Sequence, residues 1–189
     1  MEDRGFIVDP GGEPETIGSP VFLSGVQPDA ILITHGHQDH IAAAAELKKE
    51  TGADIYGSSE VDAVLTEPQR FQLFPGLPEV KRASVDYLLA GGEELDIGGI
   101  PVTVVATPGH SRGSLCFYAG GNLFTGDLLF HGSVGRSDLP GGSFEELEDS
   151  VRRLMRMFPP DTVVYPGHGN ETTLGKEKEE NIFLKDMDW

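Results

Sequence analysis

Three histidines and an aspartate fall within six residues, directly after an apolar run. The run, Ala30-Ile31-Leu32-Ile33-Thr34, carries no charge and is typical of a strand buried on both faces of a sheet. The segment that follows reads His35-Gly36-His37-Gln38-Asp39-His40. Packing so many polar groups beside a buried strand without a ligand would leave several of them desolvated, which is costly. The cluster therefore predicts a metal site at the end of a buried strand.

Three more candidate ligands follow other predicted strands. His110 comes after Thr107-Pro108-Gly109, Asp127 after Gly126, and His168 after Pro166-Gly167. A glycine-rich turn at a strand end fixes a side chain in position and lets the backbone approach closely. Imidazole and carboxylate suit zinc, iron or manganese, and seven such ligands are too many for one tetrahedral ion. The pattern predicts two divalent ions, most simply Zn²⁺, that share one carboxylate; the candidate ligands are His35, His37, Asp39, His40, His110, Asp127 and His168.

Two other residues of metal-binding types are not assigned to this site. His131 fits no ligand position, so we expect an ordinary polar loop residue there. Cys116 lies mid-strand between Leu115 and Phe117, where a small core residue is expected. As the only cysteine, it excludes an intrachain disulfide and a cysteine-rich metal site, and a reducing, cytoplasmic location is the simplest interpretation.

Length and charge narrow the class of protein. We expect residues 1–189 to form one domain, because 189 residues with 38% hydrophobic side chains suffice for one core. A net charge of −17 repels phosphate backbones and anionic membrane surfaces, so no nucleic-acid or membrane partner is expected. No apolar run approaches the ~20 residues that span a bilayer, and Met1–Arg4 does not resemble a signal peptide. The 25 glycines and 13 prolines argue against a helical bundle.

Hydrophobic patterning predicts alternating strands and helices, and hence an α/β or α+β layered domain. Ser143 with Glu146 three residues later is typical of a helix N-terminus. Gly98-Gly99 and Gly120-Gly121 are expected to turn two hairpins. Strands are predicted over 6–8, 30–34, 54–56, 94–97, 102–106, 114–118, 122–125 and 162–165, and helices over 41–51, 59–65, 144–158 and 175–181.

The spacing His35-x-His37-x-Asp39-His40 resembles the signature of the metallo-β-lactamase superfamily, and the His110, Asp127 and His168 motifs resemble its later motifs in the same order. The resemblance covers nearly the whole chain and implies a four-layer αββα sandwich with a binuclear site. It assigns one metal to His35, His37 and His110, the other to Asp39, His40 and His168, and the bridge to Asp127. It implies catalytic roles for Asp39 and Asp127, with a water activated between the two ions as the nucleophile.

Within the superfamily, the sequence is most similar to short bacterial glyoxalase II-like proteins. Asp127 stands where the β-lactamases of this fold carry Cys or Ser, which disfavours antibiotic hydrolysis. The segment over 135–142 resembles one shared by the glyoxalase II-like thioesterases and by persulfide dioxygenases, whereas the segment over 167–184 is most similar to the glyoxalase II-like group. This resemblance implies a thioesterase acting on S-D-lactoylglutathione or a related glutathione conjugate. Arg112 and Arg136, in loops near the predicted site, are candidates to pair with a substrate carboxylate.

Two alternatives to the thioesterase stay open, and three features depart from the family pattern. An iron-dependent persulfide dioxygenase would use His35, His110 and Asp127 as a facial triad, and a shortened scaffold would bind metal without turnover. Only residues 2–8 precede the Asp9-Pro10-Gly11 turn, where the family has a pair of antiparallel strands, so the first sheet is expected to be one or two strands short. The helical glutathione-binding domain of larger glyoxalase II enzymes is not expected here, and Asn181-Ile182 stands where the family usually has Asn-Pro. The sequence does not predict the oligomeric state.

Overall fold

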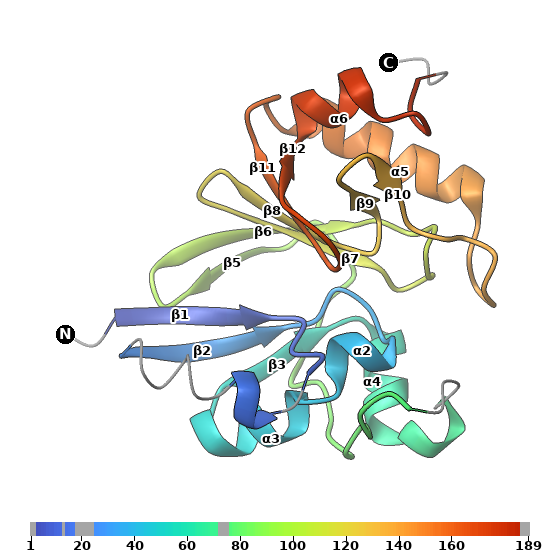
Figure 1. Ribbon diagram of the computed structural model, residues 1–189. Helices are drawn as coiled ribbons and strands as arrows, with labels where there is room; N and C mark the ends of the chain where they lie inside the picture. The colour runs from blue at the N-terminus through green and yellow to red at the C-terminus, as the bar shows by residue number, and fades with distance from the viewer. Residues whose placement is uncertain (1–2, 13, 18–24, 72–75, 186–189) are drawn as a thin grey trace.

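Two β-sheets lie face to face, with helices on the outer side of each (Figure 1). The computed structural model describes residues 3–12, 14–17, 25–71 and 76–185. In sequence order the strands of the first sheet are β1 (Asp3–Val8), β2 (Val26–Leu32), β3 (Asp54–Gly57) and β4 (Tyr87–Leu88). Those of the second are β5 (Glu94–Ile97), β6 (Ile100–Ala106), β7 (Leu115–Ala119), β8 (Asn122–Gly126), β11 (Val163–Pro166) and β12 (Thr172–Thr173). This arrangement confirms the αββα prediction.

The helices divide between the two outer faces (Figure 1). Helices α2 (Gln38–Ile41), α3 (Ala44–Thr51) and α4 (Ser59–Thr66) cover the first sheet, followed by the 3₁₀ turn η1 (Pro68–Arg70). Helices α5 (Phe144–Met157) and α6 (Leu174–Glu180) cover the second, beside the small hairpin of β9 (Leu129–Phe130) and β10 (Ser133–Val134). No helix in the described part of the chain is both long and apolar enough to cross a membrane.

The first sheet is parallel in the order β1-β2-β3-β4, which leaves β1 at its edge. Ala30 and Leu32 of β2 pack between the sheets, while Ile31 packs under the helices, so this strand is buried on both faces as predicted. Its predicted bounds were wrong. Pairing with β1 extends β2 back to Val26, which local hydrophobicity cannot signal. The strand ends at Leu32 because the Thr34 amide donates to the Asp9 side chain.

The helix predicted over 41–51 is two helices. The first, α2, begins at Gln38, inside the histidine cluster, and therefore places Asp39 and His40 on a helical turn. The helix is interrupted before α3, where the Ala43 amide donates to the Pro10 carbonyl at 2.9 Å. The predicted end of the helix is confirmed: Gly52 is left-handed, with φ 76°, and its amide donates to the Lys48 carbonyl. This hydrogen bond holds the turn after β1 against the segment that carries Asp39 and His40.

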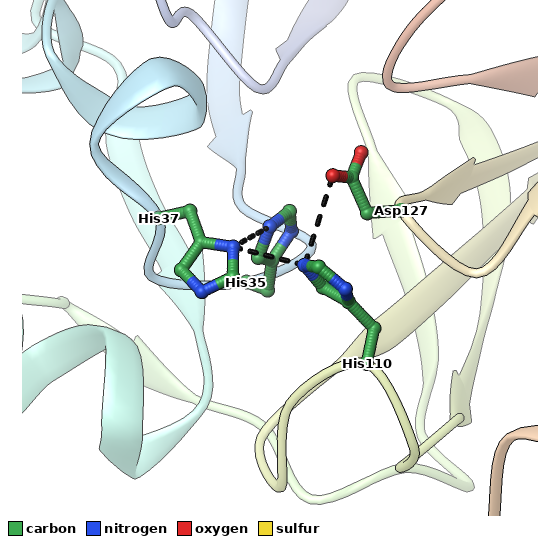
Figure 2. A group of neighbouring side chains, drawn as sticks. All are labelled: His35, His37, His110 and Asp127. Atoms are coloured by element: carbon green, nitrogen blue, oxygen red, sulfur yellow. Dashed lines mark hydrogen bonds and ion pairs between the residues drawn. The ribbon is translucent and has the colours of Figure 1, made fainter. Parts of the chain in front are cut away.

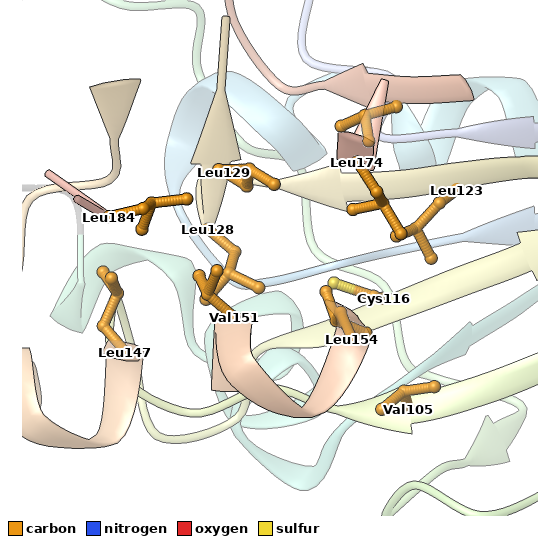
Figure 3. Packing of buried hydrophobic residues seen from close by; sticks show 11 residues of the cluster. Val105, Cys116, Leu123, Leu128, Leu129, Leu147, Val151, Leu154, Leu174 and Leu184 are labelled. Atoms are coloured by element: carbon orange, nitrogen blue, oxygen red, sulfur yellow. The ribbon is translucent and has the colours of Figure 1, made fainter. Parts of the chain in front are cut away.

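The second sheet runs β12-β11-β8-β7-β6-β5, with both predicted glycine hairpins present. Ser143 caps α5 as predicted, because its Oγ accepts from the Glu146 amide at 3.3 Å. Leu147, Val151 and Leu154 of α5 are fully buried against this sheet (Figure 3). Strand β11 lies parallel to β8, so that Asp127 and His168 follow neighbouring strand ends. The layers thus deliver the candidate ligands to one edge.

Cys116 is a core residue, as predicted, and is fully buried beside Val105 and Leu154 (Figure 3). Burial raises the pKa of its thiol to about 12, only partly offset by the hydrogen bond with Thr107. Since the thiolate is the reactive form, we expect the native protein to leave a chromogenic disulfide reagent unreacted at pH 8. One thiol should appear after denaturation; rapid labelling of the folded protein would contradict this burial.

Candidate metal centre

Four strand ends bring all seven predicted ligands to one edge of the sandwich. His35 and His37 follow β2, with Asp39 and His40 on α2, whereas His110, Asp127 and His168 follow strands of the second sheet. Figure 2 shows His35, His37 and His110 converging, with Asp127 directed toward His110. The ligand atoms of these four residues lie within 4.8 Å of one another, and so do those of Asp39, His40 and His168. The structure therefore brings together the two sets expected from the sequence.

Asp127 lies between the two sets. Its Oδ2 is 3.6 Å from His110 Nε2 and 3.7 Å from His168 Nε2, whereas its Oδ1 is 3.3 Å from His40 Nε2. Asp39 Oδ2 is 3.2 Å from His168 Nε2. Two ligands of a tetrahedral zinc lie roughly 3.4 Å apart, given a Zn–N distance of about 2.0–2.1 Å. The observed spacings suit a pair of cations with Asp127 in the bridging position.

Hydrogen bonds behind the histidines fix their tautomers. His40 Nδ1 lies 2.9 Å from Asp9 Oδ2, and His110 Nδ1 lies 2.7 Å from the Arg136 carbonyl oxygen. Both oxygens only accept, so each Nδ1 carries the proton and each Nε2 keeps a lone pair. Thr34 donates its hydroxyl to Asp9 and so accepts from His35 Nδ1, at 3.0 Å. In their neutral forms, three histidines thus turn unprotonated Nε2 atoms into the site, as metal ligands do.

These lone pairs are not satisfied by protein atoms alone. Nε2 of His35 and of His110 lie 3.0 and 2.9 Å from His37 Nδ1, which can donate a proton to only one of them. His40 Nε2 and Asp127 Oδ1 are buried without a hydrogen-bond partner in the described part of the chain. Unsatisfied buried polar atoms are rare and need an explanation. A pair of divalent cations satisfies all of these atoms, so the residues fit the predicted metals.

Burial and charge set the protonation of the group. Burial, aided by the neighbouring imidazoles of His40 and His37, lowers the pKa of His35 well below its ordinary value. Burial and His110 lower the pKa of His37 to about 4, so both side chains are neutral at pH 7, as metal ligation requires. Burial acts to lower the pKa of His40 too, but Asp127 and Asp9 outweigh it and raise that pKa. Without a metal, His40 is therefore also protonated on Nε2 between the two carboxylates, and a cation bound there would take the place of this proton.

The site is buried on one side and open on the other. His35, His40 and His110 are at most 3% exposed, whereas the side chains of Asp39 and His168 are 35% and 54% exposed. A cavity of about 250 Å³ opens onto the site and is lined by His37, Asp39 and Asp127, among others. A small molecule can therefore approach from the side of Asp39 and His168.

Asp9 belongs to the site and was missed in the sequence. Its carboxylate accepts from the Thr34 amide at 2.7 Å, from the Thr34 hydroxyl and from His40. Its φ of 47° is the single left-handed value among the non-glycine residues that the structure describes. Backbone strain of this kind marks functional sites. A usable signal was present, because Asp9 follows a strand and precedes Pro10-Gly11, as the predicted ligands follow their strands.

The two arginines predicted to bind substrate differ in their surroundings. The guanidinium of Arg136 is paired with both carboxylate oxygens of Asp138, at 2.8 and 2.9 Å, and its carbonyl holds His110. Arg112 is exposed and makes no ion pair with any described residue. His131 lies at the surface beside Lys176, with its Nε2 3.0 Å from Lys176 Nζ, away from the ligand sets as expected.

Gly167 gives the site its close packing. A Cβ at this position would clash with Asp127 Oδ1 and would lie 2.5 Å from His40 Cε1. Gly167→Ala is expected to displace one of these ligands and lower zinc affinity by about 10-fold or more, the size of effect seen when ligand positioning is disturbed. Competition with a chromogenic chelator measures this affinity.

Gly121→Ala is the matched control. Gly121 has a φ of 86° and open space around it, so alanine should cost only about 1 kcal/mol of stability through backbone strain. Zinc affinity should stay at the wild-type value in this variant. Equal zinc affinity in Gly167→Ala and wild type would contradict the packing described here.

The fold and the paired histidine–aspartate sets define a metallo-β-lactamase-type metal centre. The sequence model of the metallo-β-lactamase superfamily matches residues 2–168. The chain therefore belongs to this superfamily of metal-dependent hydrolases. The chain is 38% identical to the hydroxyacylglutathione hydrolase GloC of Haemophilus influenzae, over 97% of this chain and 88% of that protein.

Two solved structures are similar along most of the chain. The BLEG-1 B3 metallo-β-lactamase has 35% identity and a TM-score of 0.91, covering 97% of this chain and 90% of its own. TTHA1623, in a di-iron-bound form, has 38% identity and a TM-score of 0.78, covering 93% and 87%. The neighbours thus include proteins of different activities and at least one that binds two metal ions.

Proposed function

We propose that this protein is a thioesterase of the glyoxalase II type, which hydrolyses S-D-lactoylglutathione or a related thioester with two divalent ions. The observation that carries the proposal is the position of Asp127 between two complete sets of histidine and aspartate ligands. Similarity to a hydroxyacylglutathione hydrolase favours a thioester over other acyl substrates.

The metals would be held by His35, His37 and His110 on one side and by Asp39, His40 and His168 on the other, with Asp127 between them. Two divalent ions in these positions supply Lewis-acid polarisation of the substrate carbonyl and lower the pKa of water. The protein's part is to hold the ligands still. Asp9 fixes His40, Thr34 fixes His35, and the Arg136 carbonyl fixes His110, so little reorganisation is needed during the reaction.

The chemistry of a thioester suits this arrangement. A thiol has an ordinary pKa of about 8.5, so its thiolate leaves without receiving a proton in the transition state. The acyl carbon can approach from the open side, past Asp39 and His168. A substrate of this kind needs the site to position the carbonyl rather than to protonate a poor leaving group.

An iron-dependent persulfide dioxygenase is the second candidate; the di-iron-bound neighbour supports it only in that a similar protein holds iron. It would use His35, His110 and Asp127 as protein ligands, a combination that suits iron. β-Lactam hydrolysis, disfavoured by Asp127 at sequence level, enters the test because one neighbour is a B3 metallo-β-lactamase.

Zinc-loaded and iron-loaded protein should be compared without oxygen and in air. We expect the zinc form to cleave S-lactoylglutathione anaerobically, because zinc is redox-silent and hydrolysis needs no oxidant. Glutathione persulfide with an oxygen electrode tests the dioxygenase, and a chromogenic cephalosporin tests β-lactam cleavage. A zinc form inert toward thioesters, beside rapid oxygen uptake by the iron form, would replace the thioesterase by the dioxygenase.

A further inference from the structure

A second cavity, of about 300 Å³, lies beside the metal centre between α4 and two loops of the second sheet. We call it the α4 cavity. Ala63 and Val64 of α4 and the nearby Phe71 form one wall, and Leu139 and Pro140 form the other. Arg112 also lines the cavity. Glu60, Ser111 and His37 line it as well. The walls are therefore mainly apolar, with one cationic and one anionic side chain among them.

The α4 cavity is continuous with the reaction site. His37, a predicted metal ligand, and Leu139 line both this cavity and the one that opens onto the metal centre. Gly36, beside His37, packs closely on α4, since a Cβ there would lie 3.1 Å from Val64 Cγ2. A molecule that places its carbonyl at the metals can therefore extend one arm along α4.

Two polar side chains at the cavity, those of Glu60 and Ser111, are held by neighbouring residues. Glu60 accepts from the Gly113 amide, and Ser111 Oγ lies 2.9 Å from Ser114 Oγ. These contacts fix the loop that carries Arg112. The Arg112 guanidinium makes no ion pair with the described residues, whereas Arg136 is held by Asp138. Among the described residues, the cavity thus offers apolar surface and one cationic side chain without an ion pair.

These properties select between the two arms of a glutathione thioester. The glutathione arm is a tripeptide with polar groups along its whole length, and burying them unpaired is costly. A volume of about 300 Å³ is at the low end for ligand pockets and suits a short arm. Lactoyl would leave most of the apolar wall uncovered. An apolar acyl chain would cover that wall, and a terminal carboxylate would pair with Arg112.

We infer that the α4 cavity is an acyl-binding pocket for thioesters whose acyl arm is apolar and ends in a carboxylate. The inference rests on the proposed thioesterase function and specifies its substrate class. Val64, Leu139 and Ala63 set the length and shape of the chain that fits, and Arg112 selects the charge at its end.

The test compares three glutathione thioesters that differ only in the acyl group: lactoyl, hexanoyl and adipoyl. We expect kcat/KM for hexanoyl to exceed that for lactoyl by about 10-fold or more, as apolar contacts in a pocket permit. Adipoyl, which adds the carboxylate to a chain of the same length, should exceed hexanoyl by about fivefold, the effect of a partly exposed ion pair.

Two variants assign these preferences to the cavity. Ala63→Phe fills it and should abolish the preference for hexanoyl and adipoyl over lactoyl; Ala63 is exposed, so the fold should tolerate the change. Arg112→Gln should remove the adipoyl advantage alone, through KM rather than kcat. Ala90→Phe and Arg156→Gln, at exposed positions away from the cavity, are the matched controls and should retain both preferences.

A binding experiment separates this inference from the proposed function. The thioethers S-methyl-, S-hexyl- and S-(5-carboxypentyl)glutathione cannot be hydrolysed, and calorimetry measures their affinity for the zinc-loaded protein. Tightest binding of the carboxypentyl compound, lost in Ala63→Phe and reduced in Arg112→Gln, supports the pocket even if no thioester is cleaved. If wild type cleaved all three thioesters with equal kcat/KM, or if Ala63→Phe lowered kcat/KM equally for all three, the acyl-binding pocket would be contradicted. The proposed thioesterase function would not be affected by either result.

Discussion

Asp127→Ala is expected to lower thioester turnover by at least ~10²-fold, the usual loss when one positioned electrostatic group is removed. The reason is geometric: Asp127 Oδ1 faces His40 and its Oδ2 faces His110 and His168, so this single side chain serves both ligand sets. Zinc content should fall as well, because Asp127 is proposed to bind both ions. Steady-state kinetics and elemental analysis of the same preparation measure the two effects.

His131→Ala is the control, since His131 lies at the surface next to Lys176. It should keep wild-type activity and zinc content. Circular dichroism of both variants shows whether the fold is retained. Equal, mild losses in Asp127→Ala and His131→Ala would mean that the reaction takes place elsewhere in the molecule.

The second large effect is expected at Asp9, which is not among the seven predicted metal ligands. Its carboxylate holds the proton of His40 on Nδ1 and, through Thr34, that of His35. Replacing such a supporting carboxylate typically costs 10- to 100-fold in metal affinity, and we expect a loss of about this size in Asp9→Ala. Competition between the protein and a chelator for zinc measures it.

Asp9→Asn refines the test. The amide oxygen can still accept from Thr34, but the negative charge beside His40 is gone, so an intermediate zinc affinity is expected. Asp161→Ala, at an exposed position in the turn between α5 and β11, is the control and should leave zinc affinity unchanged. If Asp9→Ala binds zinc as tightly as wild type, the hydrogen bonds to Thr34 and His40 do not position the ligands.

Much of the fold could be predicted because local signals agree with the tertiary structure. The glycine hairpins, the Ser143 cap and the Gly52 helix end are each set by a few neighbouring residues. Predictions were wrong where distant segments decide. Strand β2 begins at Val26 because β1 pairs with it, and the helix break before Ala44 depends on the Pro10 carbonyl. No periodicity within those segments contains this information.

The candidate site shows the same division. Motif spacing groups the seven predicted ligands, because each follows a strand end or lies in the turn after one. Spacing does not reveal which groups hydrogen-bond to the ligands and orient them. Asp9 acts on His35 through Thr34, and Arg136 contributes its carbonyl rather than its side chain. It also does not rank Arg112 above Arg136, a distinction that depends on the ion pair with Asp138.

The number of metal ions bound per chain tests the central claim most directly. Protein stripped of metal and titrated with zinc, with bound metal measured by elemental analysis, should saturate at two ions per chain. Asp39→Ala should lower that number to one, because Asp39 lies with His40 and His168 and not with the set of His35, His37 and His110. Saturation at one ion per chain, unchanged in Asp39→Ala, would contradict a binuclear centre.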